Sequence, residues 1–182
     1  MSEEYLIRNG APTLAGLKTA NLFTCPYQDK AEVVAAVSRW NRELLPKGLR
    51  VLPLHFWEKR VLLYLYRPKM LSEDLSREEA RQILHPLGYD CSQNAKCIVR
   101  LTEKLRTQAE FPHEIGLFLG YPPADVRGFM KNSRACKCVG CWKVYGDEEA
   151  AKRKFAQYKT CTQVYCRQWA KGMGMNRLAV AD

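Results

Sequence analysis

The fold class depends on residues 51–66, which read Val51-Leu52-Pro53-Leu54-His55-Phe56-Trp57, Glu58-Lys59-Arg60 and Val61-Leu62-Leu63-Tyr64-Leu65-Tyr66. Two apolar runs with β-branched and aromatic residues flank three polar residues, a pattern that predicts an antiparallel β-hairpin. Pro53 has no N–H group to donate to a neighbouring strand, so we expect its strand to lie at a sheet edge or to be bulged there. The sequence therefore predicts a small antiparallel β-structure.

Helical patterns lie on both sides of this hairpin. Asp29-x-x-Glu32 has the form of a capping box and predicts a helix that ends near Leu45. Pro12 predicts the first turn of a short helix that runs to Phe23. Other patterns predict a short strand over 142–145 and helices over 76–84, around 98–105, over 147–158 and over 162–171, with short helical segments after Pro112 and Pro123. The predicted fold class is α+β, mostly helical, with a small antiparallel hairpin or sheet and a Cys-rich C-terminal region.

Length and composition are those of an ordinary globular protein. The chain has 182 residues, of which 47 % are hydrophobic and 26 % charged, a size that supports one sizeable core. We expect a single domain over 1–182, with a basic, Cys-rich subregion at 131–172 and a frayed tail at 173–182. The longest apolar run, 61–66, is too short to cross a membrane, and the acidic start does not resemble a secretory signal. The sequence thus predicts a cytoplasmic protein with no membrane partner.

Cysteine is the most informative residue type in this sequence. Five of the eight cysteines lie between residues 136 and 166, and in a reducing compartment clustered thiols are typical of metal sites or redox centres. A Cys-x2-Cys spacing lets two thiolates face one ion, with Val139-Gly140 as the tight turn. We predict a zinc ion or an iron–sulfur cluster held by four thiolates, with Cys136 spare: Cys138, Cys141, Cys161 and Cys166.

The second pair of predicted ligands carries a geometric requirement. A gap of four residues within a regular helix places two side chains about 140° apart around its axis, so Cys161 must lie at or before a helix start. Separate thiols, partly buried and partly redox-active, and a switching disulfide are the alternatives. A closed four-thiolate zinc site favours a structural over a catalytic role, because catalytic zinc keeps an open position.

A second candidate site lies near the N-terminus. A short helix would bring hydroxyl, ammonium and amide groups near free N–H groups that bind anions, the side chains being Thr13, Lys18, Thr19 and Asn21. The alternative is a solvated helix face over a leucine core. Cys25 is a candidate nucleophile, although burial is the commoner role of such a cysteine. His113 is a candidate base or ligand, but it diverges from Glu114 by about 100° on a helix.

Charge is concentrated in the C-terminal third of the chain. The formal net charge is +10, and residues 131–182 hold 11 basic against 4 acidic residues. Nearby basic groups favour thiolate over thiol, and basic residues interleaved with aromatic ones are typical of single-stranded nucleic-acid surfaces. Phe155 and Tyr158, like Tyr165 and Trp169, instead fall at helix-face spacing, which favours a place in the core. An acidic protein or nucleic acid is the partner class that this charge favours.

Four longer segments carry a resemblance: Pro12-Thr13-Leu14-Ala15-Gly16-Leu17-Lys18-Thr19-Ala20-Asn21-Leu22-Phe23, Phe111-Pro112-His113-Glu114-Ile115-Gly116-Leu117-Phe118-Leu119-Gly120-Tyr121-Pro122, Asp125-Val126-Arg127-Gly128-Phe129 and Cys141-Trp142-Lys143-Val144-Tyr145-Gly146-Asp147. They resemble domain of unknown function 3793, a bacterial family typical of anaerobes, over nearly the whole chain. The resemblance implies a full-length, single-domain protein and no established activity. Family members often carry His-Cys where this sequence has Asn9-Gly10, so a site built on that pair would be altered or absent here.

Three functions follow from these patterns. The first is a metal-binding protein whose four-cysteine site has a structural or regulatory role. The second is a redox or small-anion enzyme that uses Cys25, Lys18 and His113, or an iron–sulfur cluster. The third is nucleic-acid binding through the basic C-terminal third.

Overall fold

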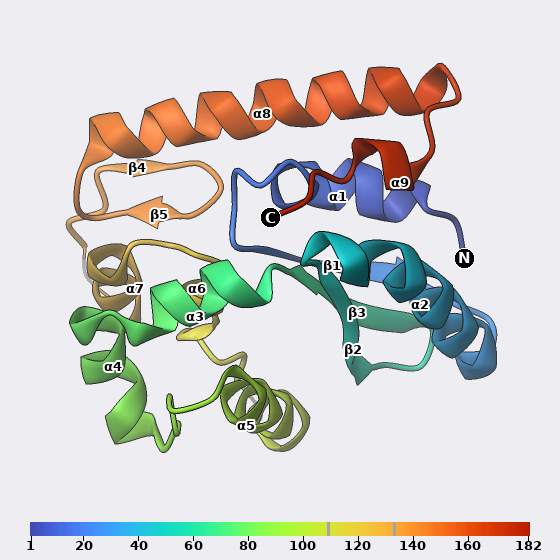
Figure 1. Ribbon diagram of the computed structural model, residues 1–182. Coiled ribbons are helices and arrows are strands. Elements are labelled where there is room, and N and C mark those ends of the chain that lie inside the picture. The colour runs from blue at the N-terminus through green and yellow to red at the C-terminus, as the bar shows by residue number, and fades with distance from the viewer. Residues whose placement is uncertain (109, 133) are drawn as a thin grey trace. The chain divides into compact units, whose positions relative to one another are not determined.

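The computed structural model describes residues 1–108, 110–132 and 134–182. These residues form two compact units, the first made of 1–69 and 158–182 and the second of 70–157. The first unit is therefore assembled from two stretches of chain that flank the second unit in the sequence. The two units can belong to one domain, so the single-domain expectation stays a prediction. The α+β class, mostly helical with small antiparallel sheets, is confirmed (Figure 1).

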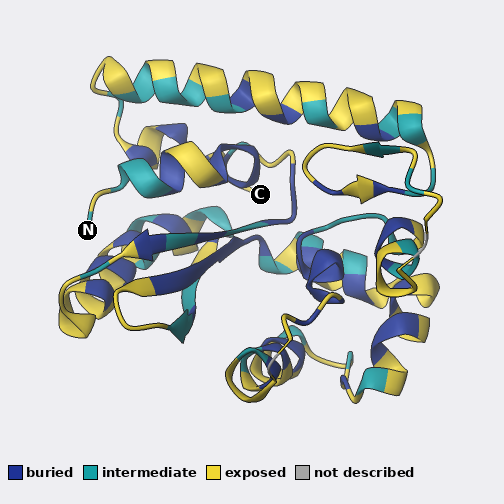
Figure 2. Cartoon of the chain, turned by 180° about the vertical axis from the view of Figure 1, so that it is seen from behind, coloured by how far each residue is buried: buried dark blue, intermediate teal, exposed yellow. Residues whose placement is uncertain are grey.

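The first unit contains a three-stranded antiparallel sheet in the order β1-β3-β2. Its strands are β1 (Ala20–Pro26), β2 (Arg50–Phe56) and β3 (Arg60–Tyr66). The predicted hairpin is confirmed as β2 and β3, and β2 lies at the edge of the sheet. The register between them shifts at Pro53/His55, as expected for a residue that cannot donate a ladder hydrogen bond. β3 is the central strand, and Figure 2 shows it buried along nearly its whole length.

The helix predicted from Pro12 to Phe23 is wrong. Pro12 lies in the last turn of α1 (Glu4–Leu14), and the chain leaves this helix through Gly16, whose φ of +74° suits a residue without Cβ. The next residues form β1, which pairs with β3 in antiparallel register. Pairing with a buried central strand outweighs the local helical pattern of this segment.

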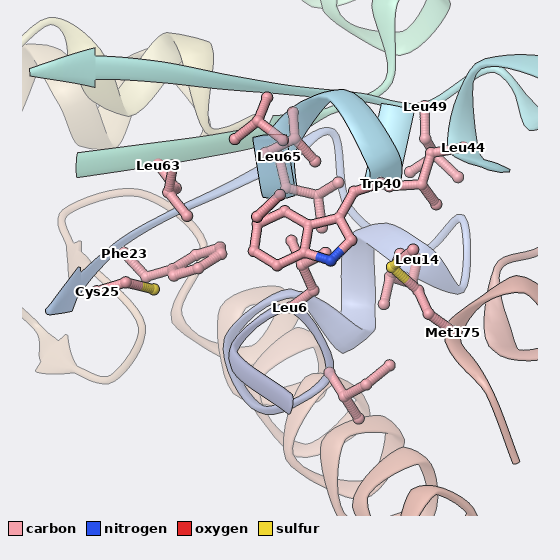
Figure 3. Packing of buried hydrophobic residues seen from close by; sticks show 14 of the residues in the cluster. Leu6, Leu14, Phe23, Cys25, Trp40, Leu44, Leu49, Leu63, Leu65 and Met175 are labelled. Atoms are coloured by element: carbon pink, nitrogen blue, oxygen red, sulfur yellow. The ribbon is translucent and has the colours of Figure 1, made fainter. Parts of the chain in front are cut away.

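The core of the first unit lies between its sheet and its helices. Asp29 caps α2 (Lys30–Leu44) as predicted, since its carboxylate accepts a hydrogen bond from the Ala31 N–H at 3.0 Å. α1 packs against β1 and β3, and α2 packs against β2. Trp40 of α2 is fully buried among apolar side chains from α1, β1 and β3 (Figure 3). The short helix η1 (Leu45–Lys47) then returns the chain to β2.

The tail expected to be frayed at 173–182 is ordered instead. α9 (Met175–Leu178) buries Met175 and Leu178 in the core of the first unit. The Lys47 ammonium donates hydrogen bonds to the carbonyl oxygens of Asn176 and Ala179, at 2.6 and 2.7 Å. Apolar residues among the small ones of this tail explain the correction, because their burial offsets the cost of ordering it.

The second unit is built mainly from short helices. They are α3 (Pro68–Ser76, which begins just before the unit), α4 (Glu78–Leu84), η2 (His85–Leu87), α5 (Asn94–Thr107), α6 (Ile115–Phe118) and α7 (Pro123–Met130). A two-stranded sheet follows, formed by β4 (Cys138–Val139) and β5 (Lys143–Val144). Within this unit α7 packs against α4, α6 and β5. The predicted helical segments are confirmed here, whereas α3 has no counterpart among the predictions.

One helix replaces the two predicted over 147–158 and 162–171. α8 (Glu148–Ala170) is unbroken in Figure 1 and extends from the second unit into the first. The Lys159-Thr160 junction holds neither glycine nor proline, and the Thr162 hydroxyl donates back to the Tyr158 carbonyl oxygen at 2.9 Å. Nothing in the local sequence therefore ends the helix there. None of the described helices combines the length and apolar character that crossing a membrane requires.

Candidate functional site

The four predicted metal ligands are divided between the two units. Cys138 and Cys141 belong to the β4–β5 hairpin of the second unit, whereas Cys161 and Cys166 lie on the part of α8 that belongs to the first. The expectation that Cys161 lies at or before a helix start is wrong, because α8 continues through it. On this helix the Cys161 and Cys166 side chains are about 140° apart around the axis and do not face one ion.

Two thiols of this set, Cys138 and Cys161, have a raised pKa and not the lowered one expected from basic surroundings. Burial raises the pKa of Cys161. Partial burial, followed by the nearby Glu148 carboxylate, raises the pKa of Cys138. Among the residues that the structure describes, no three His, Cys, Asp or Glu side chains are grouped so as to hold a metal ion. Zinc or iron–sulfur binding at these cysteines, with Cys136 spare, therefore stays a prediction.

The N-terminal candidate residues lie at the end of a helix and not at its start. Thr13 is buried in the last turn of α1, and its hydroxyl donates to the Asn21 side-chain oxygen at 2.7 Å. Lys18 and Thr19 are also buried, in the link to β1. Free N–H groups of a helix N-terminus, on which the predicted anion site depends, are absent from this part of the described chain. These side chains instead tie α1 to β1.

The carbonyl groups at this helix end are bound by Arg67, which follows β3. Its buried guanidinium donates to the carbonyl oxygens of Thr13 and Leu14, at 2.8 and 2.9 Å, and to that of Val180 at 2.7 Å. It also forms an ion pair with Asp182. Arg67 thereby satisfies carbonyls that a helix C-terminus leaves without partners, and the segment has a structural role.

Cys25, Lys18 and His113 do not form one site within either unit. Cys25 and Lys18 belong to the first unit and His113 to the second. Burial raises the pKa of Cys25 to about 11, an effect that Arg60 only partly offsets. A thiol so protonated at neutral pH is a poor nucleophile, which matches the alternative of a buried structural cysteine.

The second unit contains a cavity of about 390 Å³, within the range typical of small-molecule sites. Its walls come from α6, α7, the β4–β5 hairpin and the segments before α6 and α7. Most lining side chains are aromatic or aliphatic: Phe111, Ile115, Tyr121, Val126, Phe129, Val139 and Trp142. His113, Asp125 and Lys143 supply the charged or titratable groups. We take this cavity as the candidate functional site and call it the aromatic pocket.

Two pairs of rings form the aromatic pocket. Tyr121 and Trp142 stack with ring centroids 4.7 Å apart, and the Tyr121 hydroxyl donates to the Cys141 carbonyl oxygen at 3.2 Å. The His113 ring lies 4.8 Å from that of Phe129, and the Lys143 ammonium lies 5.3 Å from the Phe129 centroid. Such offset and cation–π contacts fix the orientation of planar groups.

Asp125 fixes the hairpin side of this pocket. Its side chain is 3 % exposed, and one carboxylate oxygen accepts the indole N–H of Trp142 at 2.7 Å. The other oxygen accepts the backbone N–H groups of Tyr145 and Gly146, both at 2.7 Å. One buried carboxylate on α7 therefore holds both Trp142 and the end of the hairpin, and its charge is compensated by three donors.

A buried ion pair holds the segment that carries His113. Glu114 accepts hydrogen bonds from the Lys104 ammonium at 2.7 Å and from the Tyr89 hydroxyl at 2.9 Å. Burial alone would raise the pKa of Glu114, but the hydrogen bonds from Lys104, its own backbone and Tyr89 hold that pKa below its usual value. Glu114 is thus turned toward α5, while the His113 ring lies tilted against that of Phe129, so the two do not act as one acid–base pair.

Close backbone approaches complete the pocket. A Cβ atom on Gly140 would lie 2.3 Å from ring carbons of Phe155, and one on Gly128 would lie 2.4 Å from Cγ of Tyr145. Glycine at these two positions lets α8 and the end of the hairpin pack directly against backbone. The pocket is therefore pre-formed by tight packing around it.

The polar side chains that line this pocket belong to His113, Asp125, Lys143 and the ring-bearing Tyr121 and Trp142. Its described lining residues include no serine, threonine or cysteine nucleophile. The Asp125 oxygens are already engaged by three donors, whereas Lys143 and His113 can face a ligand. An apolar, planar body with a negative group near Lys143 is the molecule that such a lining suits.

Sequence reasoning missed most of this site. Of the predicted candidates only His113 lines the pocket, while Asp125, Phe129 and Trp142 were not among them. A signal was available, because three of the four segments that carry the family resemblance supply most of the lining: 111–122, 125–129 and 141–147. Ring spacing alone did not show it, since segments far apart in sequence meet only in the fold.

Aromatic residues of the basic C-terminal third point inward. Phe155 meets the Trp142 ring edge-on at 4.6 Å, and Tyr158 is buried. Tyr165 and Trp169 pack against the core of the first unit. These rings thus serve as core residues, the alternative that helix-face spacing favoured over a stacking surface for nucleic acid.

Comparison with known proteins identifies a family and no nearer relative. The model of the family described as "Protein of unknown function (DUF3793)" matches residues 6–179, nearly the full length of the chain. Neither the curated proteins nor the solved structures contain a match. The resemblance of the four sequence segments is thereby confirmed, and the chain belongs to the DUF3793 family.

Proposed function

We propose that the second unit binds a small planar molecule with an apolar, aromatic body and one negatively charged group. The observation that carries this proposal is the aromatic pocket, a cavity of about 390 Å³ walled by rings and aliphatic side chains. Sites for small molecules are concave, mostly apolar and equipped with a few polar groups. The ligand's ring system lies against Phe129 and Trp142, where it gains stacking and burial.

The negative group is inferred from the charges that line the pocket. Asp125 gives its carboxylate oxygens to three N–H donors and so presents little unpaired negative charge. The Lys143 ammonium lies over the Phe129 ring, where a bound carboxylate or sulfonate can reach it. His113, whose ring lies tilted against the same Phe129 ring, offers a further polar contact.

A titration with 8-anilinonaphthalene-1-sulfonate tests this function, because the dye combines planar rings with one sulfonate. We expect saturable fluorescence enhancement at one dye per chain. Phe129→Ala should weaken the affinity at least tenfold, about 1.4 kcal/mol, and Lys143→Gln should weaken it less. Circular dichroism of each variant checks that the dye reports on folded protein.

Trp57→Ala is the matched control for this titration. Trp57 is 44 % exposed and its ring lies 4.6 Å from that of His55, much as Phe129 is 36 % exposed and its ring lies 4.8 Å from that of His113. Its loss removes an aromatic residue of the first unit and should leave dye affinity unchanged. Equal affinity of the wild type and Phe129→Ala, or binding that does not saturate, contradicts the proposal.

Metal binding is the second candidate, favoured by the hairpin that carries the first cysteine pair. Cys138 lies on β4 and Cys141 just before β5, with the Gly140 N–H donating to the Trp142 carbonyl oxygen in the turn at 3.0 Å. Cys161 and Cys166 remain the predicted partners, although they diverge on α8. Metal analysis and an absorption spectrum of anaerobically purified protein test this, with Cys138→Ser against Cys25→Ser as control. A zinc or iron content that Cys138→Ser does not lower contradicts it.

Three expectations from the sequence complete the proposal. A cytoplasmic location and an anaerobic bacterial host agree with a cysteine-rich chain whose thiols are free. A nucleic-acid or acidic protein partner is the least supported, since the aromatic residues of the basic region pack inward.

A further inference from the structure

Two cysteines outside the predicted metal site lie together in the second unit. Cys91 is half-buried in the loop after η2, and Cys97 is fully buried at the end of the first turn of α5. The Cys97 thiol donates to the Asp90 carbonyl oxygen at 3.3 Å, which places its sulfur beside the residue that precedes Cys91, and the nearby Cys91 thiol contributes to the raised pKa of Cys97. Both are free thiols. A half-buried cysteine thus lies beside a buried one.

The loop that carries Cys91 is held at the start of α5. The Asp90 carboxylate accepts the Lys96 ammonium at 2.7 Å and the Ser92 N–H at 3.0 Å. Lys96 precedes Cys97, so this ion pair joins the residue before one cysteine to the residue before the other. The two cysteines are therefore held near each other by a defined turn, which favours their reaction with each other.

We propose that Cys91 and Cys97 form a reversible disulfide in response to hydroperoxides, with Cys91 oxidised first and Cys97 closing the bond. With hydrogen peroxide, the Cys91 sulfur attacks one oxygen and the O–O bond breaks. The thiol proton leaves with the other oxygen as water, and Cys91 becomes a sulfenic acid. The Cys97 sulfur then attacks the Cys91 sulfur, the S–O bond breaks, and the Cys97 proton leaves in a second water. Two thiols lose two electrons, and one peroxide becomes two waters.

Burial assigns the two roles. Cys91 is the sulfur that solvent and a small oxidant can reach, whereas Cys97 has no exposed surface. Burial, followed by the neighbouring Cys91 thiol, raises the pKa of Cys97 to about 12, so Cys97 is a slow nucleophile that acts on the adjacent Cys91 sulfenic acid rather than on free peroxide. Once Cys91 is a sulfenic acid, the adjacent Cys97 sulfur is its nearest nucleophile in the described turn. An accessible thiol beside a resolving one is the usual arrangement of a redox-responsive pair.

The sequence between the two cysteines gives a direct assay. Trypsin cleaves after Lys96, so the disulfide joins two separate peptides, residues 82–96 and 97–100. The full chain is reduced, treated with one equivalent of hydrogen peroxide, alkylated and digested. We expect the linked pair of peptides by mass spectrometry, its disappearance after dithiothreitol, and at least a tenfold loss of Cys91 alkylation relative to the reduced sample.

Three variants separate this proposal from general thiol oxidation. Cys97→Ser should accumulate sulfenic acid at Cys91, which dimedone traps, and Cys97→Ala gives the same readout if the serine variant does not fold. Cys91→Ser should leave Cys97 unmodified. Cys141→Ser removes an exposed thiol of the same unit and should leave the yield of the 91–97 link unchanged.

Two results would overturn the inference. One is a peptide map in which Cys91 stays alkylatable after peroxide. The other is a link between Cys91 and a cysteine other than Cys97. Dye binding to the aromatic pocket is measured in a separate experiment. Failure of the disulfide proposal and failure of the proposed ligand binding can therefore be told apart.

Discussion

The two units of this chain are held together in different ways. The first unit has a filled apolar core in which Trp40 is fully buried between helices and sheet (Figure 3). Both units bury charged side chains, Lys18 and Arg67 in the first and Lys104, Glu114 and Asp125 in the second, but the second unit also keeps a cavity of about 390 Å³. Helices are short in the second unit, and directional hydrogen bonds link them.

This difference teaches how a cavity can be kept open in a small unit. Apolar packing is non-directional and favours filling every void. Hydrogen bonds and ion pairs set distances and angles but add little net stability, because their partners lose hydration. The first unit is thus expected to supply stability and the second to supply geometry.

The largest expected effect is on the filled core. Trp40→Ala should lower the free energy of unfolding by about 3–5 kcal/mol, since it removes a fully buried ring. Urea unfolding followed by circular dichroism measures this change. Val34→Ala, on the same helix but 60 % exposed, should stay within about 0.5 kcal/mol. Equal losses would contradict the picture of a filled core around Trp40.

The next effect concerns the buried ion pair of the second unit. Glu114→Ala leaves the Lys104 ammonium buried without its carboxylate and should cost about 3 kcal/mol. Replacing both residues, with Lys104→Met and Glu114→Leu, should recover much of that loss, because no charge is then left unpaired. Urea unfolding of the three proteins checks the order. A double variant less stable than Glu114→Ala would refute this account.

The same pair predicts a pH dependence. The folded-state pKa of Glu114 lies below its value in the unfolded chain, so its ionisation stabilises the fold above about pH 4.3, the usual value for Glu. This contribution is lost as the pH falls through the lowered folded pKa. The stability difference between wild type and Glu114→Gln should therefore shrink between pH 7 and pH 3. A difference that is constant over this range argues against an ionised Glu114.

A smaller and more local effect is expected at Asp125. Asp125→Asn replaces one acceptor oxygen by an amide group that faces N–H donors, at a cost of about 1–3 kcal/mol. Hydrogen exchange should show lost protection of the Tyr145 and Gly146 N–H groups. Asp90→Asn, at an exposed position, is the control and should leave these amides protected. Unchanged exchange of these two amides in Asp125→Asn would contradict the idea that Asp125 of α7 holds the end of the hairpin.

The smallest effect is on reactivity and compares a thiol from each unit. Iodoacetamide should modify the exposed Cys141 readily, whereas the buried Cys25 should react only through unfolding. Because the pKa of Cys25 is raised to about 11, its protonated form stabilises the fold below about pH 9, and this contribution is lost as the pH rises toward 11. Peptide mapping gives both rates. Equal alkylation rates of Cys25 and Cys141 would show that the reagent reaches the core of the first unit without unfolding.

The sequence predicted those elements whose signals are local. The β2–β3 hairpin and its bulge at Pro53 follow from two apolar runs separated by polar residues and from one missing N–H group. Asp29 was predicted as a helix N-cap from the nearby Glu32, and it caps α2. By contrast β1 was taken for a helix, because its pairing with β3 is a contact between distant residues. The prediction of two helices in place of α8 had no local signal behind it, because neither residue 159 nor residue 160 ends a helix.

The candidate site was less predictable than the fold. Cysteine spacing drew attention to Cys161 and Cys166, but spacing does not reveal whether a helix continues between two residues. Asp125 looked like an ordinary first-turn carboxylate, and only the fold brings it to Trp142. A pocket made from several distant segments has no periodic signal in any one of them.

The bonds of Arg67 have a consequence for the order of events during synthesis. Two of its partners, Val180 and Asp182, are made more than a hundred residues later than Arg67 itself, and Met175 completes the same core. The first unit is therefore expected to stay unfinished on the ribosome while residues 70–157 emerge and fold. Chaperones that shield apolar surface would meet this chain through its N-terminal sheet, and release would follow translation of its last turn.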